Sequence, residues 1–193
     1  MTSDSLFNPG YYTESELKSA GFRSVGSNVR IAKNNTIVGL NNISVGNNVR
    51  IDGYCGIIAN GPGVLMIGSN VHIGGWCFLA AAEGITISDF AGLSQGVKIY
   101  SRSDDYTGDY LTNPTVPEIL RGGKRGSVFL GKHVIVGAGT VILPDLVIPE
   151  GCAVGAQSLV TKNLKPWGIY FGSPVRRLRN RSTRLLQLEG QLP

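Results

Sequence analysis

The sequence predicts an all-β fold in which the chain coils into a triangular prism with three short strands per turn. Over six stretches every sixth residue is aliphatic, and a glycine often follows it directly. A six-residue period fits neither the 3.6-residue period of a helix nor the two-residue period of a flat strand, but it suits a short strand followed by a corner. The eighteen positions of this aliphatic ladder are Val25, Ile31 and Ile37; Val45, Ile51 and Ile57; Ile67, Ile73 and Leu79; Ile87, Leu93 and Ile99; Leu130, Val136 and Ile142; and Ile148, Val154 and Val160.

The spacing of the ladder predicts about six turns over residues 25–165, with a long insertion at 102–127. Each turn contains three six-residue units and tolerates extra residues at one place, as in other solenoid repeats. The ladder side chains of successive turns are expected to stack inside the prism at the spacing of paired strands, about 4.8 Å. Segments such as Gly46-Asn47-Asn48 and Gly68-Ser69-Asn70 suit the corners, where positive φ is cheap for glycine.

The two ends of the chain are expected to cover the open ends of the prism. Residues 1–24 form an N-terminal segment with a helix at 13–20, because Thr13 can cap this helix and Glu16 follows three residues later. Residues 166–193 form a C-terminal tail, in which residues 176–188 are predicted to be a second helix. Covering the ends matters because an exposed sheet edge invites pairing with other chains.

Composition limits the class of protein. The chain has 193 residues, a net charge of +5 and 27 glycines, but no run of 18 apolar residues that could span a membrane. Residues 1–10 lack the features of a signal peptide, which favours a cytoplasmic location. The three cysteines all fall four residues after a ladder position; a disulfide between Cys55 and Cys77, one turn apart, is conceivable, but reduced and buried thiols are expected. With two histidines and no CxxC motif, no metal site is predicted.

Beyond the ladder and the insertion, four short motifs stand out in the second half of the chain. They are Gly137-Ala138-Gly139, Val154-Gly155-Ala156, Val160-Thr161-Lys162 and Gly172-Ser173-Pro174-Val175-Arg176. Together these features resemble the hexapeptide-repeat acetyltransferases, in particular the galactoside and maltose type and the bacterial enzymes that acetylate surface-polysaccharide sugars. The resemblance covers residues 11–181, and it implies a left-handed parallel β-helix, a homotrimer with each active site between two subunits, and acetyl-CoA as co-substrate.

The insertion departs from this family at the expected catalytic position. In the galactoside and maltose enzymes the corresponding loop begins with a histidine that acts as general base, whereas here Asp104 and Asp105 stand nearest to that place. An ordinary aspartate, with a pKa near 3.9, is a weak base, but two adjacent carboxylates in a desolvated cleft are expected to raise one another's pKa. Asp104 and Asp105 are therefore catalytic candidates, with a solvated acidic turn as the alternative. Ser103 and Tyr106 beside them are substrate-binding candidates.

The two histidines are further candidates for the base, because an imidazole pKa near 6.5 suits proton transfer. His72 is expected to face outward toward a neighbouring subunit, either as a catalytic group or as an interface contact. His133 occupies a corner directly after the insertion, either close to the cleft or as a solvated corner residue. Trp76, also at a corner, either stacks on a sugar or adenine ring or packs between subunits.

The resemblance also assigns residues to the coenzyme. Backbone groups near the late corners are expected to pair with the amides of the pantetheine arm, and basic side chains to meet its phosphates. A solvated basic tail is the alternative for the latter. The cofactor-binding candidates are Gly137, Ala138, Ala156, Gln157, Lys162, Arg176 and Arg177.

The function predicted first is an acetyl-CoA-dependent O-acetyltransferase acting on a sugar hydroxyl, in the biosynthesis of a bacterial surface polysaccharide such as O-antigen or capsule. An alternative is an N-acetyltransferase of a nucleotide-linked amino sugar, since a neutral amine is a good nucleophile and needs a less powerful base. A third possibility is a non-catalytic trimeric β-helix that only binds a sugar or coenzyme. Nucleic acid is not expected as a partner, because no aromatic residues interleave with the basic C-terminal run, and no stable membrane insertion is expected.

Overall fold

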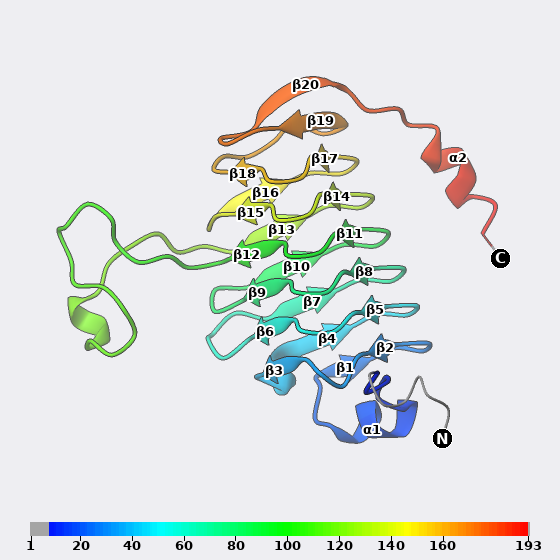
Figure 1. Cartoon of the computed structure of the whole chain (residues 1–193), viewed down its shortest axis with the longest axis horizontal. Coiled ribbons are helices and arrows are strands. Elements are labelled where there is room, and N and C mark those ends of the chain that lie inside the picture. Colours follow the sequence, from blue (N-terminus) through cyan, green and yellow to red (C-terminus); the bar gives the residue numbers. More distant parts are fainter. Residues whose placement is uncertain (1–7, 193) are drawn as a thin grey trace.

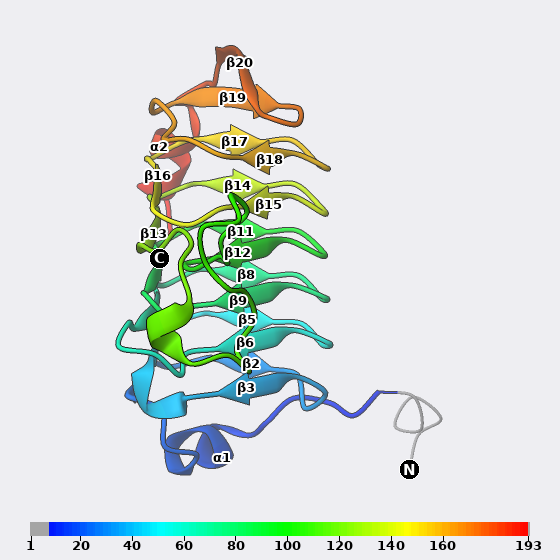
Figure 2. The same ribbon diagram turned by 90° about the vertical axis from the view of Figure 1, so that its left-hand side faces the viewer.

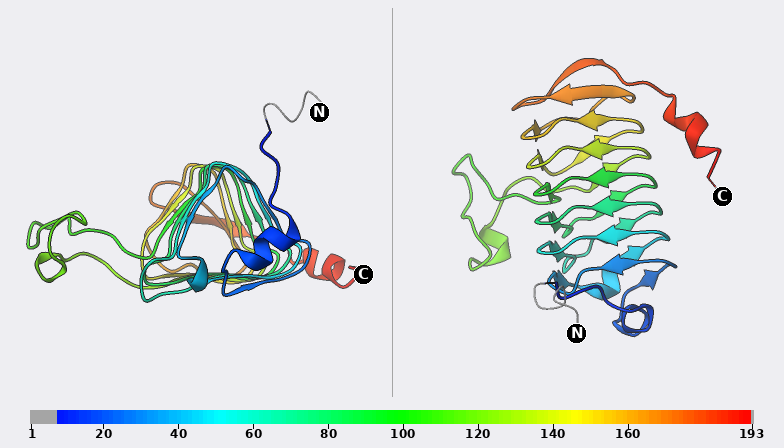
Figure 3. Two further views of the ribbon diagram at one scale, coloured as in Figure 1. Left: turned by 90° about the horizontal axis from the view of Figure 1, so that it is seen from below. Right: turned by 45° about the vertical axis from the view of Figure 1, so that its right-hand side comes forward.

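In the computed structural model, which describes residues 8–192, the chain winds into a left-handed parallel β-helix of triangular cross-section (Figures 1 and 3). Its first face is a sheet of β1 (Ser24–Val25), β4 (Ile43–Val45), β7 (Leu65–Ile67), β10 (Ile85–Ile87), β13 (Val128–Leu130) and β16 (Leu146–Ile148). The second face contains β2 (Arg30–Ile31), β5 (Arg50–Ile51), β8 (His72–Ile73), β11 (Gly92–Leu93), β14 (Ile135–Val136), β17 (Ala153–Val154), β19 (Gly168–Phe171) and β20 (Arg176–Asn180). The third contains β3 (Thr36–Val38), β6 (Gly56–Ile58), β9 (Phe78–Ala80), β12 (Lys98–Tyr100), β15 (Val141–Ile142) and β18 (Leu159–Val160).

These strands form six complete turns and, with β19, the start of a seventh, which confirms the predicted coil (Figure 2). The first corner of each turn joins the first face to the second, the second corner joins the second to the third, and the third corner leads to the next turn. Ladder residues pair in register, as in Ile51 with Ile73. All ladder positions are buried except Val25 and Ile37, which are partly buried in the first turn.

The glycines at the corners are required by the close stacking of turns. A Cβ atom on Gly46 would lie 2.6 Å from the carbonyl carbon of Gly68, on the next turn. Positive φ, which the sequence led us to expect at these glycines, falls instead two residues later, as at Asn48 (φ 55°) and Asn70 (φ 58°). The side-chain amide of Asn48 donates to that of Asn70 at 3.2 Å, so these corner residues stack into a hydrogen-bonded column.

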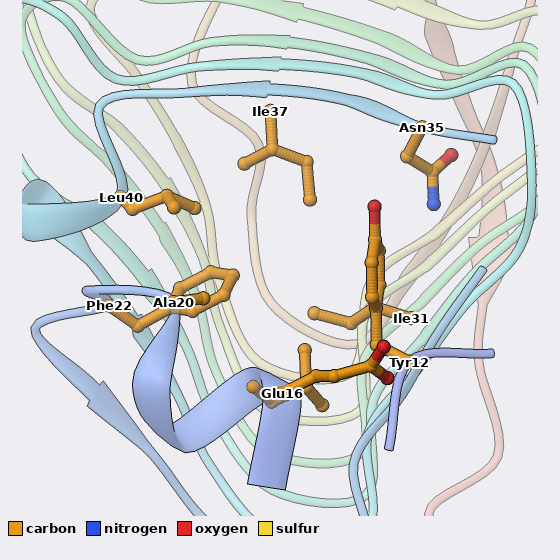
Figure 4. Close-up of a pocket in the computed structure, with 9 residues that line it drawn as sticks. Tyr12, Glu16, Ala20, Phe22, Ile31, Asn35, Ile37 and Leu40 are labelled. Atoms are coloured by element: carbon orange, nitrogen blue, oxygen red, sulfur yellow. The ribbon is translucent and has the colours of Figure 1, made fainter. Parts of the chain in front are cut away.

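Helix α1 (Glu14–Ser19) closes the N-terminal end of the prism, as predicted. The hydroxyl of Thr13 accepts from the backbone amide of Glu16, and the carboxylate of Glu16 accepts from the backbone amide of Thr13 at 2.6 Å. Leu17 is buried against the core, but the cover is incomplete and leaves a cavity of about 250 Å³ (Figure 4). Apolar side chains, among them Phe22 and Ile37, line most of it, which explains why the first turn is the least buried.

The C-terminal end differs from the prediction of a helix over residues 176–188. Residues 176–180 form β20, which pairs antiparallel with β19, and only α2 (Leu185–Glu189) is helical. The physical reason is the open edge of β19, whose backbone groups would otherwise lack partners on that side. Two short 3₁₀ segments, η2 (Leu40–Asn42) and η3 (Glu118–Leu120), lie at the third corner and in the insertion.

Several expectations concern residues outside the core. Within residues 8–192, neither helix is long and apolar enough to cross a membrane, and no group of three His, Cys, Asp or Glu side chains is placed to hold a metal ion. The three cysteines are free and buried. Residues 1–7, which belong to the predicted N-terminal segment and to the stretch expected to lack a signal peptide, and residue 193 lie outside the described residues.

We predict that Gly46→Ala lowers the free energy of unfolding by about 1–3 kcal/mol, the usual cost of overpacking, because the new methyl group collides with the backbone of Gly68. Gly92→Ala is the matched control, since no atom lies within 4 Å of a Cβ built there. Urea unfolding measures both variants. Equal losses in the two would contradict the role given to the stacking of turns.

Candidate functional site

The insertion at residues 102–127 leaves the prism at the third corner, after β12, and extends away from the body (Figures 1 and 3). Its two ends meet in a bridge between Arg102 and Arg125. The carboxylate of Glu118, on η3, accepts hydrogen bonds from Arg102 at 2.7 Å and from Arg121, and it forms an ion pair with Arg125 at 2.6 Å. These hydrogen bonds lower the pKa of Glu118 despite an opposing effect of desolvation. One carboxylate shared by three guanidinium groups therefore holds the loop together.

Asp105 serves the loop's own turn. One of its carboxylate oxygens accepts from the hydroxyl of Thr107 at 2.8 Å, and the other from the backbone amides of Gly108 at 2.8 Å and Asp109 at 3.1 Å. The hydrogen bond from Thr107, helped by those from the backbone and only partly opposed by desolvation, lowers the pKa of Asp105. The expectation of a raised pKa is therefore wrong for this residue, because its neighbours are donors that stabilise the charged form.

Asp104 and Ser103 instead line a groove at the base of the loop, of about 410 Å³, which we call the loop groove. Arg102 and Arg121 contribute to its wall, as does Glu83 from the preceding turn. No described side chain or backbone amide hydrogen-bonds to the carboxylate of Asp104, so it can accept from a ligand. Tyr106, predicted beside it as a substrate contact, is 92% exposed on the outer part of the loop.

The second corner carries an exposed aromatic pair. The rings of Tyr54 and Trp76, on consecutive turns, stack with centroids 4.5 Å apart and planes 11° from parallel. They line a second groove, of about 390 Å³, whose other wall is the segment at residues 8–11 and which we call the aromatic groove. Trp76 was predicted as a possible stacking residue, and its partner Tyr54 was missed.

Beside the aromatic groove, His72 is paired with Asp52. Its Nε2 lies 2.8 Å from a carboxylate oxygen of Asp52, and Arg50 donates to the other oxygen at 2.6 Å. Burial favours the neutral form of Asp52, but the hydrogen bonds from His72 and Arg50 outweigh it, so the pKa of Asp52 lies below its ordinary value. The His72 ring remains half exposed on the second face.

His133 lies at the first corner, away from both grooves. Its Nε2 is 2.8 Å from a carboxylate oxygen of Glu189 on α2, and its ring stacks on Phe90 with centroids 5.1 Å apart. Lys132 donates to the other oxygen of Glu189. Viewed along the prism, the loop and α2 lie at different corners (Figure 3). Within one chain the structure therefore does not bring His133 and Asp104 together. The contacts of His133 anchor α2 instead.

The predicted coenzyme residues fall into two groups. Gly137, Ala138, Ala156 and Gln157 lie at the second corner on the fifth and sixth turns, where Ala156 and Gln157 are exposed. Lys162, Arg176 and Arg177 line a groove of about 500 Å³ at the C-terminal end, the terminal groove. There Arg177 donates to Asn180 at 2.9 Å and to the backbone carbonyls of Pro166 and Trp167.

Comparison with known proteins shows to which family the chain belongs. No protein-family model matches the chain. It is 41% identical over 179 residues, 93% of each chain, to a dTDP-4-amino-4,6-dideoxy-D-glucose acyltransferase from Escherichia coli. The chain belongs to the hexapeptide-repeat acyltransferase family.

Solved structures of another acyltransferase agree with this assignment. AntD, an N-acyltransferase from Bacillus cereus, superposes on the chain with a TM-score of 0.91 at 43% identity in a complex of a variant with dTDP-4-amino-4,6-dideoxyglucose and coenzyme A, covering 94% of this chain and 96% of AntD. AntD has also been solved with dTDP and 3-hydroxybutyryl-CoA (TM-score 0.88, 42% identity, 94% and 95% covered). A putative lipopolysaccharide biosynthesis O-acetyl transferase from E. coli K12 is 25% identical over 148 residues, covering 75% of this chain and 72% of that protein.

The resemblance drawn from the sequence motifs is thus confirmed, and the protein is an acyltransferase. Two side chains of the acyltransferase were missed, Tyr54 and Asp52. Each lies one turn before a residue that was singled out, at 22 and 20 residues from Trp76 and His72. Applying the ladder register to aromatic positions would have found Tyr54, which lies 22 residues before Trp76, the same offset that separates the paired residues Arg50 and His72. The register partner of His72 is Arg50, so the register alone would not have found Asp52, whose carboxylate meets His72 from two residues further along the chain.

We predict that replacing the two loop aspartates of this acyltransferase affects different properties. Asp104→Ala should lower turnover while leaving amide hydrogen exchange in residues 107–110 unchanged. Asp105→Ala should raise that exchange about tenfold or more, because it removes the acceptor for the amides of Gly108 and Asp109. Since the pKa of Asp105 is lowered, its contribution to the turn is complete above its ordinary value near 3.8 and is lost as pH falls through the lower folded value.

Exchange followed by mass spectrometry, together with a thiol-release assay, measures both effects. Faster exchange in Asp104→Ala, or normal exchange in Asp105→Ala, would reverse the roles assigned to the two residues.

Proposed function

We propose that the protein transfers an acyl group from acyl-CoA to the amino group of a nucleotide-linked amino sugar, a dTDP-4-amino-4,6-dideoxyhexose. The observation that carries this proposal is the 41% identity, over 93% of both chains, to an acyltransferase of such a sugar. The O-acetyl transferase relative from E. coli K12 is 25% identical over a shorter span. The comparisons therefore support the N-acylation alternative better than the O-acetylation predicted first.

The chemistry of the loop fits an amine acceptor. The amine nitrogen attacks the thioester carbonyl, the C–S bond breaks and an amide forms. The proton that the nitrogen loses is taken up by the departing thiolate, which leaves as the free thiol of coenzyme A. A neutral amine needs no base to make it nucleophilic, whereas a sugar hydroxyl does. The insertion at residues 102–127 contains no histidine. In its place Asp104 accepts a hydrogen bond from the amino group and orients it, a role that requires no raised pKa.

The acyl-CoA lies along the late part of the second corner. Its pantetheine amides pair with backbone groups near Gly137 and Ala156, and its phosphates meet Lys162 and Arg176 in the terminal groove. Of the two arginines predicted there, Arg176 is the freer, because Arg177 is engaged with Asn180 and two carbonyls. The acyl group is acetyl or a short hydroxyacyl, in keeping with the 3-hydroxybutyryl-CoA bound by AntD.

A homotrimer completes the site. The loop groove is at the third corner and the backbone groups assigned to the pantetheine arm are at the second, so two edges of the prism must be brought together. A loop that extends from one subunit can reach the second corner of its neighbour. The third face, between these corners, carries apolar outward side chains such as Val38, Ile58 and Phe78, which suit a subunit contact. His72 lies on the adjoining second face, beside the second corner.

The product is a building block for a bacterial surface polysaccharide such as lipopolysaccharide, made in the cytoplasm. Three free, buried cysteines fit a reducing compartment. The E. coli K12 relative is assigned to lipopolysaccharide biosynthesis, which supports the same setting.

The first test of this function is a thiol-release assay with acetyl-CoA or 3-hydroxybutyryl-CoA and a matched pair of acceptors. We expect turnover with dTDP-4-amino-4,6-dideoxyglucose and at least 100-fold less with the dTDP sugar that carries a hydroxyl at C4, because the hydroxyl requires a base that the loop lacks. Mass spectrometry of the product locates the acyl group. Preferential acylation of a hydroxyl would restore the O-acetyltransferase, and coenzyme binding without turnover on any acceptor would favour a binding protein.

A second test addresses the coenzyme. Arg176→Ala should raise the KM for acyl-CoA about tenfold with little change in kcat, because one charge-assisted hydrogen bond to a phosphate contributes on the order of 1.5–3 kcal/mol. Arg23→Ala, an exposed arginine at the N-terminal end, is the control and should change neither constant. Dephospho-CoA esters extend the test, since a lost phosphate contact makes the variant less sensitive to removal of that phosphate. An unchanged KM in Arg176→Ala would place the phosphates elsewhere.

A further inference from the structure

The aromatic pair of Tyr54 and Trp76 is not explained by the packing of its own chain. Tyr54 is 58% exposed and Trp76 is 64% exposed, although both are large apolar side chains. Two stacked rings at the mouth of a groove of about 390 Å³ form a flat apolar surface that is open to solvent. Surfaces of this kind bind flat, aromatic ligands.

The backbone at Tyr54 and Trp76 has φ of 63° and 65°, in the left-handed region that bulky residues rarely adopt. Positive φ recurs at the corners of the prism, however, and the same corner position is filled on later turns by Gly96 (φ 71°), Gly139 (φ 68°) and Gln157 (φ 54°). The conformation therefore belongs to the coil, and what distinguishes Tyr54 and Trp76 is the size and exposure of their rings.

Two arginines lie on the second face beside residues that line the groove. Arg30 and Arg50 are in register on β2 and β5, on the first two turns. Arg50 is paired with Asp52, which lines the groove, but Arg30 forms no ion pair with any described residue and lies against the ring of Tyr11 at 6.0 Å. An aromatic platform beside arginines matches a nucleoside diphosphate, which has a flat base and a doubly charged linker.

We propose that Tyr54 and Trp76 form the platform on which the pyrimidine base of the nucleotide sugar stacks, with the diphosphate directed toward Arg30 and Arg50. This inference rests on the proposed function. The platform occupies the second and third turns of the second corner, and the predicted pantetheine contacts occupy its fifth and sixth turns. The two substrates then approach along one corner from opposite ends. They meet at the fourth turn, near Gln95 and Gly96, which is also the turn that bears the loop.

The position of the platform favours the pyrimidine over the adenine of the coenzyme. Lys162 and Arg176, the groups assigned to the coenzyme phosphates, lie at the C-terminal end of the prism. Trp76 lies on the third turn, whereas Lys162 follows the sixth turn and Arg176 lies beyond it on β20, so at least three turns, or roughly 14 Å, separate the platform from these cations. An adenine held there would separate the coenzyme's phosphates from these cations.

Calorimetric titration of the full-length assembly with dTDP and, separately, with coenzyme A tests the proposal. Trp76→Ala should weaken dTDP binding about 10- to 100-fold, the range for loss of one base-stacking contact, and leave the affinity for coenzyme A unchanged. Trp76→Phe, which keeps an aromatic ring, should retain most of the affinity for dTDP. Tyr54→Ala should weaken dTDP binding less than Trp76→Ala does, because Tyr54 supports the ring of Trp76 from one side.

Fluorescence gives a second readout that does not depend on affinity. The chain has two tryptophans, so Trp167→Phe leaves Trp76 as the only tryptophan, whose emission can be excited selectively over that of the tyrosines. Saturating dTDP should quench the emission of that variant, whereas coenzyme A should not.

Each other outcome overturns a stated claim. Weakened coenzyme A binding with normal dTDP binding in Trp76→Ala would assign the platform to adenine. Unchanged binding of both would show that the pair binds neither nucleotide, and dissociation of the assembly, measured by light scattering, would show that Trp76 is a subunit contact. If wild-type protein bound no dTDP at all, the proposed nucleotide-sugar function itself would fail. If wild-type protein bound dTDP and Trp76→Ala did not alter this binding, only the proposal that Tyr54 and Trp76 bind the base would fail.

Discussion

The close stacking of successive turns constrains everything else in this molecule. Strands on one face lie at the spacing of a hydrogen-bonded pair, about 4.8 Å, and where two corners meet there is no room for a side chain, as at Gly46 and Gly137. Each turn must therefore repeat the path of the one below it, and a residue's surroundings are set by the residue one turn away. Side chains form columns: an aliphatic column inside, an asparagine column at the first corner, and aromatic or glycine positions at the second.

The grooves lie at corners where these columns change in composition or are interrupted. The second corner carries the exposed rings of Tyr54 and Trp76 on its second and third turns, and glycine and alanine on its fifth and sixth turns, apart from Gln157. The third corner is interrupted once, by a loop that its own arginines and Glu118 hold in shape. Within one chain these two features lie at different corners of the prism.

The ladder was readable from the sequence because burial of one side of each strand imposes a strict period on residues such as Ile73 and Leu79. The strand at residues 176–180 was not, since its pairing is decided by the open edge of β19 and not by its own arginine-rich composition. The lowered pKa of Asp105 was equally hidden, because it depends on how the loop's backbone amides are turned toward it. Tyr54 was within reach, because it lies one turn before Trp76 in the ladder register, whereas the register partner of His72 is Arg50 and not Asp52. The preference for an amine acceptor came from the comparisons, while the sequence supplied only the missing histidine.

The strand β20 affects how one molecule can associate with the next along the axis of the coil. A parallel coil has no natural last turn, and an uncovered final strand would let one molecule add to the next and grow into a fibre. β20 runs in the reverse direction, and all five of its residues are exposed, three of them arginines. Its reversed direction and its like charges oppose addition of a further coil. The strand that opposes further growth of the coil is thus also the one that places Arg176 in the terminal groove.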